Sequence, residues 1–535
     1  MSNRGKALLA RVMLLQPSLE IGLVVLCCLP CATSQCQQSI SHTGSKSFQQ
    51  FGDDIDTVRK QLHIPGMAAA IVDGDRVVWE ENYGLADVQN GVPVHAATEF
   101  CIASVSKTMA AAIVMQLRQA GKLQIDDPIS KYIPDSGMPE NITIRQIMSH
   151  TSDGTPGEEF LYNGARYAVL SRVIEKVTGE PYATVVSNRI LRPLKMNRTI
   201  PGLDAPGFQE PQRELAKPYR LDLSSPTGIQ AGDVPAPGLF SAATGIISNV
   251  NDMARYAVAL EGSELVNEES KTLMFTPTRS LKGEDLPYGL GWFVQNYLGQ
   301  EIVWHYGQAD SYASLFVRIP KAKLTLIVLA NSGAMSDAFR LLDGNAMRSL
   351  LALNFLKDVV LRDRSTEPSV RNRFELDEEI DQALARIYLG EPDQALPYAR
   401  MAFASGVLPS PPDLTTLYLL ARLHDRSLNQ TTEAIGMELI QRHPRLSPAL
   451  FYLATYYERN GVPEKAMPLF ERIAEIRPPL LHWTSTSALL ELGRWYADRN
   501  PSEARKYLQR VVDSGDNSSG AVDEAKEMLR RVPKQ

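Results

Sequence analysis

The chain has 535 residues, of which 44% are hydrophobic and 22% are charged, and its formal net charge is −6. This length predicts two or more domains, and the composition is typical of globular proteins. No run of basic residues stands out, so we expect no nucleic-acid partner.

The first 34 residues have the pattern of a signal peptide. Basic residues precede a short apolar run and then a group of small residues: Arg4, Lys6, Arg11, residues 21–29 and residues 32–34. The apolar run is too short to span a bilayer stably. We therefore expect cleavage and export to the periplasm or the medium, with membrane association if the segment is retained. Of five cysteines, Cys36 and Cys101 lie beyond the segment, which allows one disulfide.

The next elements in chain order lead to a candidate nucleophile. A polar leader at 35–50 precedes a helix at 51–62 and a β-hairpin at 67–80, and another helix spans 104–120. This helix carries Ser104 and Lys107 on one face, a turn apart. A serine needs a neighbouring base to become a nucleophile, and a desolvated lysine near a helix N-terminus shifts towards its basic form. Alone, S-x-x-K also fits an ordinary amphipathic helix with a solvated lysine.

The following segments alternate between helices, a long loop and strands. The patterns predict helices at 142–148, 164–178 and 245–256, the last with Asn251 or Asp252 near its start, a loop region at 201–237, and strands at 288–295, 301–305, 314–319 and 324–330. A hairpin followed by helices and then strands predicts an α+β fold, in which helices flank an antiparallel sheet.

From about residue 375 the patterns are helical throughout. Residues 447–480 carry the small and bulky positions of a 34-residue tetratricopeptide-like repeat: Leu450, Leu453, Ala454, Tyr457, Gly461, Ala466, Phe470 and Pro478. Weaker copies are marked by Gly390, Ala395, Leu492, Trp495, Ala504 and Leu508, and 414–444 fits a degenerate member. The alternative is a generic helical bundle. Stacked repeats present a concave face, so we expect a protein partner unless the domain is a packing appendage.

These patterns together give a domain plan. It comprises a signal peptide at 1–34, a leader at 35–50, a catalytic domain at 51–345, a linker at 346–374 and an all-α helical-repeat domain at 375–535.

Several short motifs follow one another in the proposed catalytic domain. They are Ile64-Pro-Gly66, Tyr83-Gly-Leu-Ala-Asp87, Ser104-Val-Ser-Lys107, His150-Thr-Ser152, the run 156–162, Gly245-Ile-Ile-Ser248, Asp252-Met-Ala-Arg255 and His305-Tyr-Gly307. With these motifs, residues 50–340 resemble the serine β-lactamase and penicillin-binding superfamily, above all class C β-lactamases and their esterase and D-amino-acid peptidase relatives.

The resemblance implies roles for particular residues. Ser104 is the acyl-accepting nucleophile, Lys107 activates it or shares its proton, and Tyr162 acts as general base and acid. His305 and Gly307 belong to the third motif at the substrate site, and the backbone N–H groups of Ser104 and Gln308 form the oxyanion hole. His150 is expected to be structural.

One position departs from the family pattern. The second motif is usually Tyr-x-Asn, but here Gly164 stands where the asparagine is expected. In the family that amide holds the substrate carbonyl and contacts the lysine, so its loss weakens the case for β-lactam or peptide acylation. The neighbouring Asn163 could supply an amide instead.

The first hypothesis is an exported serine hydrolase that acts through an acyl-enzyme on an ester, an amide or a peptide containing D-amino acids. The alternative is a non-catalytic, penicillin-binding-like ligand sensor or scaffold that signals through its helical repeats. The eight histidines show no metal-ligand spacing, so we expect no metal and no cofactor.

Overall fold

The computed structural model describes residues 34–203, 205, 214–235, 238–405, 428–442, 444–477, 482–516 and 520–533. The predicted signal peptide apart from Ser34, residues 414–427 and 443 of the degenerate repeat, and Pro478 lie outside these residues. Across the described ranges, no helix has the length and apolar character needed to span a membrane.

A seven-stranded sheet forms the centre of the region that precedes the helical repeats, in the order β3-β2-β1-β11-β10-β9-β8. Its strands are β1 (Gly66–Asp73), β2 (Arg76–Asp87), β3 (Val92–Pro93), β8 (Phe293–Tyr297), β9 (Gln300–Ala309), β10 (Tyr312–Ile319) and β11 (Leu324–Ala330). Every neighbouring pair is antiparallel, and Met67 of β1 lies opposite Ala330 of β11. The predicted antiparallel sheet is therefore confirmed.

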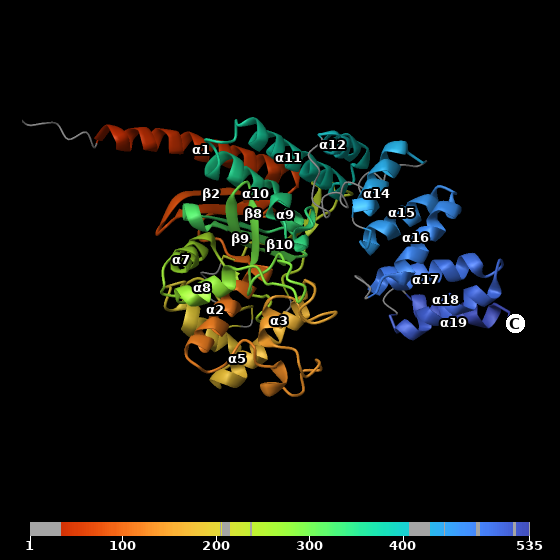
Figure 1. Ribbon diagram of the computed structural model, residues 1–535. Coiled ribbons are helices and arrows are strands. Elements are labelled where there is room, and N and C mark those ends of the chain that lie inside the picture. The colour runs from red at the N-terminus through yellow and green to blue at the C-terminus, as the bar shows by residue number, and fades with distance from the viewer. Residues whose placement is uncertain are drawn as a thin grey trace, which may run out of the picture. The chain divides into compact units, whose positions relative to one another are not determined.

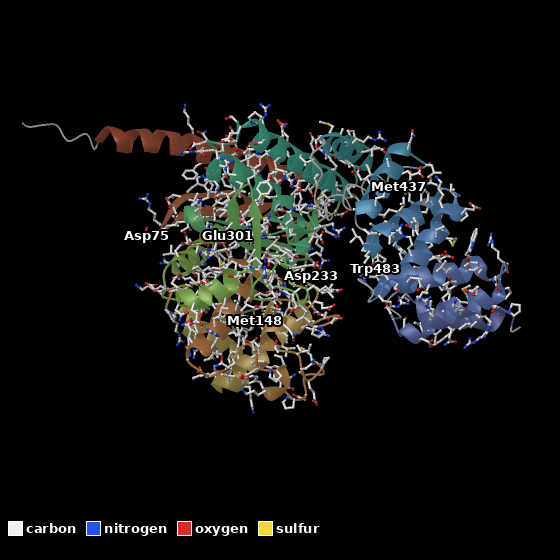
Figure 2. The ribbon with its side chains drawn as sticks, viewed as in Figure 1. Asp75, Met148, Asp233, Glu301, Met437 and Trp483 are labelled. Carbon is white, nitrogen blue, oxygen red and sulfur yellow. The ribbon has the colours of Figure 1, made fainter. Side chains whose placement is uncertain are left out.

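Helices cover both faces of this sheet (Figure 1). The core on one face is shared by α2 (Ser106–Gln119), α3 (Ile144–Met148), α5 (Leu170–Thr178), α7 (Val250–Glu261) and α8 (Glu268–Phe275). The other face packs against the end of α1 (Ser34–Gln61), α10 (Leu350–Asn354) and α11 (Pro368–Tyr388). Successive strand residues point to opposite faces, so Ala68 and Met67 enter different cores. Side chains fill the interior, with Met148 buried among them (Figure 2).

Two predicted connecting segments are wrong. The leader expected at 35–50 is helical, because α1 begins at Ser34 and continues without a break into the amphipathic helix predicted from residue 51. The linker expected at 346–374 is largely core: α10, the π-helical turn Phe355–Val360 and the start of α11 fill the second face of the sheet. Its apolar run at 350–356 is buried rather than exposed, so the chain has no break at residue 345.

The described residues after α11 form a series of helices. They are α12 (Pro392–Ala404), α14 (Gln430–Arg442), α15 (Ser447–Arg459), α16 (Pro463–Glu475), α17 (His482–Tyr496), α18 (Pro501–Ser514) and α19 (Ala521–Arg531). Helices α15 and α16 form the predicted helix–turn–helix unit, with Gly461 in a left-handed turn at φ 72°. The predicted repeat positions Leu453 and Phe470 are fully buried between the helices, so the helical-repeat prediction is confirmed.

Candidate active site

Ser104 lies just ahead of α2, on the 3-10 turn Ala103–Val105. The chain reaches this turn from a short strand, β4 (Phe100–Cys101), which pairs with β7 (Ile247–Ser248). Ala103 adopts a left-handed conformation with φ 44°. Such backbone strain costs about 1–3 kcal/mol at a non-glycine residue and is concentrated at functional sites. The serine is therefore held at the N-terminus of a buried helix, where the helix dipole favours developing negative charge.

Lys107 lies directly beneath the serine. Its Nζ is 3.0 Å from Ser104 Oγ and donates a 2.9 Å hydrogen bond to the carbonyl of Ala243. The side chain is buried, and burial lowers the pKa of Lys107 to about 7. A large fraction of this amine is therefore neutral near pH 7 and able to accept the serine proton.

Tyr162 closes the other side of the nucleophile. It lies on the loop before α4 (Gly164–Ala168), and Lys107 Nζ is 5.0 Å from its ring centroid. Burial raises the pKa of Tyr162, and the neighbouring Ser104 hydroxyl opposes this shift. Among the described residues, the buried Tyr162 hydroxyl has no partner at hydrogen-bond geometry. Tyr162 is protonated at neutral pH and can donate to a substrate atom.

Gly164 adjoins the lysine, at the position where the related asparagine was expected. A Cβ at Gly164 would lie 3.9 Å from Lys107 Nζ, so a longer side chain there would face the amine. Asn163 does not replace the missing amide. Its side chain caps α4 by accepting from the N–H of Arg166 at 3.0 Å, and it donates to Asp153 at 3.2 Å.

His150 supports this loop from below. It is buried with φ 55°, and its Nδ1 accepts a 3.0 Å hydrogen bond from the backbone N–H of Asn163. Its ring packs 4.2 Å from the ring of Tyr162, centroid to centroid. Burial, aided by the nearby Lys107, lowers the pKa of His150 well below its usual value. The side chain is a neutral support for Tyr162, as expected of a structural residue.

His305 does not reach the substrate cavity, contrary to its expected place in the third motif. The ring is fully buried, with Nδ1 donating to the carbonyl of Tyr306 at 2.6 Å and Nε2 accepting from the Tyr288 hydroxyl at 2.8 Å. Burial, with a further contribution from Lys107, lowers the pKa of His305 to about 3. A neutral, fully bonded histidine here can orient strand β9 but cannot bind a substrate group.

The other third-motif residues have different surroundings. A Cβ at Gly307 would lie 2.3 Å from the carbonyl oxygen of Ile102, so only glycine lets β9 pass this close to the chain that leads to the nucleophile. Gln308 is exposed, and its side-chain amide donates to Asp337.

Ser104, Tyr162 and Gln308 share one cavity of about 510 Å³. The lining residues come from five separate parts of the sequence: Ser104, Leu161, Tyr162, Tyr306, Gln308, Ala309, Asp310, Asp337 and Leu342. The sequence analysis placed Tyr306 in a motif without giving it a role, and it missed Ala309, Asp310, Asp337 and Leu342. The alternation of a strand could have found Tyr306, which points to the same side as Gln308, but no local pattern indicates Asp337.

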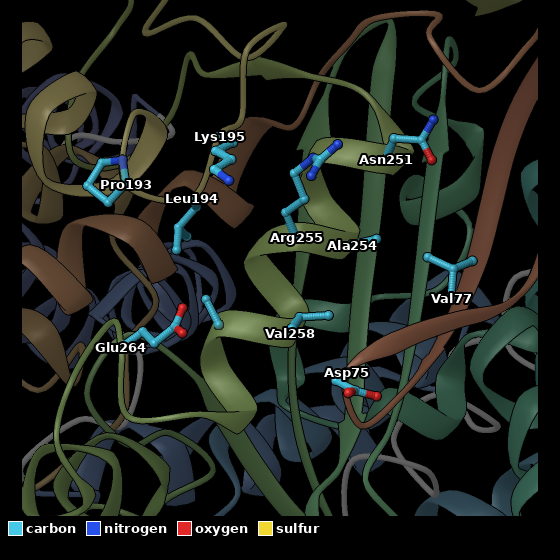
Figure 3. Close-up of a pocket in the computed structure, with 11 residues that line it drawn as sticks. Asp75, Val77, Pro193, Leu194, Lys195, Asn251, Ala254, Arg255, Val258 and Glu264 are labelled. Carbon is cyan, nitrogen blue, oxygen red and sulfur yellow. The ribbon is translucent and has the colours of Figure 1, made fainter. Parts of the chain in front are cut away.

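A second cavity of about 600 Å³ contains none of the expected site residues (Figure 3). It is lined by α7, by the turn of the first hairpin and by residues 193–195. Its charged residues are of both signs, Asp75 and Glu264 against Lys195 and Arg255, and it holds no serine or cysteine. We therefore assign the candidate chemistry to the cavity of Ser104.

Metal and disulfide chemistry have no evident place in this site. Within the described part of the chain, no three histidine, cysteine, aspartate or glutamate side chains are grouped to hold a metal ion. Cys101 is buried and free, and burial raises the pKa of its thiol to about 11.

Comparisons with known proteins find relatives for both regions of the chain. The sequence profile of the Beta-lactamase family matches residues 48–346, and that of the tetratricopeptide repeat matches residues 487–514. The protein flp of Staphylococcus aureus is 26% identical over 329 residues, 53% of this chain and 63% of that protein. An unguisins hydrolase of Aspergillus campestris is 28% identical over 345 residues, 55% of this chain and 64% of that protein.

The matched part of the chain thus spans less than two thirds of these curated relatives. Among solved structures, an octameric penicillin-binding protein homologue from Pyrococcus abyssi superposes with a TM-score of 0.52 at 24% identity, over 61% of this chain and 81% of that one. This likeness concerns the fold.

Proposed function

Because the chain belongs to the β-lactamase family, we propose that it is a serine hydrolase that works through an acyl-enzyme on Ser104. The observation that carries this proposal is the 3.0 Å contact between Ser104 Oγ and the buried Lys107 amine, whose pKa is lowered to about 7. A neutral amine at this distance is positioned to take the serine proton.

The proposed reaction has two halves. Ser104 Oγ attacks the carbonyl carbon of the substrate while Lys107 accepts its proton, and the backbone N–H groups of Ser104 and Gln308 stabilise the oxyanion. Donors fixed in advance contribute roughly 3–4 kcal/mol each to such a transition state. Tyr162, which is protonated at neutral pH, gives its proton to the leaving group, and the proton that Lys107 took from Ser104 then restores the tyrosine. Water attacks the acyl-enzyme in the second half and releases the acid, with Ser104 regaining its proton.

We propose esters and amides as the substrates, ahead of β-lactams. In the related proteins an asparagine side chain holds the substrate amide, and Gly164 removes it beside Lys107. Esters need less help of this kind, because their leaving group departs more readily. Export of the enzyme, inferred from the basic and apolar pattern of residues 1–34, is part of the same proposal. The helical repeats are proposed to bind a protein partner.

The test compares the chain from residue 35 with its Ser104→Ala variant in hydrolysis of p-nitrophenyl butyrate. We expect kcat/KM to fall by about a thousandfold or more, because removal of a nucleophile leaves only the binding and oxyanion contributions. Ser130→Ala is the matched control, since this exposed hydroxyl donates to the carbonyl of Glu140 away from the cavity. The control should keep full activity.

The non-catalytic sensor remains the second candidate function, favoured by Gly164 and by the appended repeats. Equal rates in the parent chain and in Ser104→Ala, or no turnover in either, would favour it. Labelling of Ser104 by a fluorophosphonate probe, read out by mass spectrometry, separates an unreactive serine from a poorly chosen ester.

A further inference from the structure

The cavity around Ser104 carries an unusual balance of charge. None of its nine lining residues is a lysine or an arginine, and two of them, Asp310 and Asp337, are acidic. The nearest buried amine, Lys107, is largely neutral above pH 7 because its pKa is lowered to about 7. A substrate carboxylate would therefore meet no lysine or arginine among the described lining residues and would be repelled by the acidic wall.

The two acidic residues differ in their partners. Asp310 is exposed and lies 3.4 Å from Arg220, which also pairs with Asp233 at 2.9 Å (Asp233 is labelled in Figure 2). Asp337 is half-buried, and the partner described for its carboxylate is the neutral amide of Gln308. Among the described residues, no arginine, lysine or histidine forms an ion pair with Asp337. Its charge is thus uncompensated where it faces the cavity.

The position of Asp337 is fixed by the fold rather than by a mobile loop. It ends the short helix α9 (Ala334–Asp337), which follows the central strand β11. The Ser336 hydroxyl donates to the carbonyl of Gly307 at 3.0 Å, and Gln308 donates to Asp337 itself. Two contacts therefore tie α9 to the strand that edges the nucleophile.

The remaining walls of the cavity show where a neutral part of the substrate would lie. Leu161, Leu342 and the ring faces of Tyr162 and Tyr306 are apolar, and within the described ranges the buried Tyr162 hydroxyl has no partner at hydrogen-bond geometry. A ligand that satisfies this site therefore has an acceptor atom near Ser104 and Tyr162, an apolar body and a cationic end.

We propose that Asp337 determines specificity by holding a protonated amine of the substrate, so that the preferred substrates are amides or esters whose acyl part carries an amino group. This inference rests on the proposed hydrolase function and names its substrate class. Gln308 keeps the carboxylate oriented, and Asp310 adds negative potential at the entrance.

The experiment compares two p-nitroanilides that differ in one group. Alanine p-nitroanilide, as the D and the L form, carries the ammonium group, and isobutyric acid p-nitroanilide has a methyl group in its place. We expect the parent chain to prefer the better alanine form by about tenfold or more in kcat/KM at pH 7, the size of a charge-assisted hydrogen bond. The Asp337→Asn variant should lose most of this ratio through a higher KM for the amine, and Asp337→Glu should keep part of it.

Asp343→Asn is the matched control, because Asp343 pairs with Arg340 at 3.2 Å and does not line the cavity. It should retain the preference of the parent chain. A ratio near one in the parent chain, or an unchanged ratio in Asp337→Asn, would overturn the assignment while the hydrolase function stands. Turnover of neither anilide, together with hydrolysis of p-nitrophenyl butyrate, would equally overturn it. Loss of all three activities would mean that the proposed function itself fails.

Discussion

The contacts that stabilise the sheet region internally span much longer distances in the sequence than those within the helical repeats. In the sheet region, the N–H of Gly66 donates to the side chain of Asn331, 265 residues away in the sequence, and the cavity joins residues from five separate segments. In the repeats, Tyr457 reaches Glu433, 24 residues away, and Thr484 reaches Ser447, 37 residues away. The first region must assemble as a whole, whereas each repeat depends chiefly on its neighbours.

This difference bears on where chemistry can be built. Residues at the nucleophile are desolvated by elements from the whole sheet region, and that burial is what lowers the pKa of Lys107. The repeats are thin stacks whose charged side chains remain partly exposed, as Lys465 does beside Glu433. The same residue type is therefore expected to be reactive in one region and merely solvated in the other.

Replacing one lysine in each region gives the largest expected contrast. Lys107→Met removes the proposed base but keeps an apolar side chain of similar length in the buried site, so the fold should be retained. We expect kcat/KM for p-nitrophenyl butyrate to fall by about 10²–10⁴-fold. Lys465→Met, in the repeats, should leave this value unchanged. A Lys107→Met enzyme that kept more than a tenth of the parent activity would rule out the lysine as the base.

Truncating a buried leucine in each region should separate folding from activity. Leu453 is fully buried in the repeat core and Leu315 almost fully buried in the sheet. Each substitution to alanine should cost about 2–5 kcal/mol of unfolding free energy. We expect Leu453→Ala to lower the temperature at which the helical circular-dichroism signal is lost. Ester hydrolysis at 25 °C should continue at the parent rate. Leu315→Ala should lower both the unfolding temperature and the rate of ester hydrolysis. Loss of activity in Leu453→Ala would mean that the repeats and the site unfold as one unit.

The same contrast explains which features could be predicted from sequence. The hairpins, the α15–α16 repeat unit and the Ser104–Lys107 pair are local patterns, and the described residues have each of them where the sequence places it. The helix predicted at 104–120 instead begins at Ser106, directly after the 3-10 turn Ala103–Val105. Similarly, α7 is capped by Asn249 rather than by Asn251 or Asp252.

The errors concern residues whose surroundings come from elsewhere in the chain. His305 is fully buried, and its Nε2 is bonded to the hydroxyl of Tyr288, on a separate segment. Asp337 lies on a four-residue helix that has no periodicity to read, and contacts with β9 decide its position. The segment at 346–374 resembled a linker because it lies between two recognisable patterns, yet its apolar run is covered by the second face of the sheet.

The smallest expected effect is the pH dependence of ester hydrolysis, which tests the cause of the contrast. The reactive form of Lys107 is the neutral amine, and burial has lowered its pKa from 10.5 to about 7. Activity should therefore be nearly constant above pH 8 and fall about tenfold per unit below pH 7. The butyrate ester carries no amine that titrates, so the fall in activity below pH 7 reports on the enzyme alone.

Glu458 in α15 supplies a matched control for this profile, because burial raises the pKa of its carboxyl to about 7 as well, with Glu491 adding to the shift. Because the pKa of Glu458 is higher in the folded state, its contribution to the free energy of unfolding falls as pH rises from 4.5 towards 7. The pKa of Lys107 is lowered on folding, so its contribution changes with pH in the opposite direction. If the activity limb arises at the nucleophile, Glu458→Gln leaves its midpoint in place. A midpoint that moved with Glu458→Gln would instead mean that titration of the repeats controls activity, and the two regions would then be coupled.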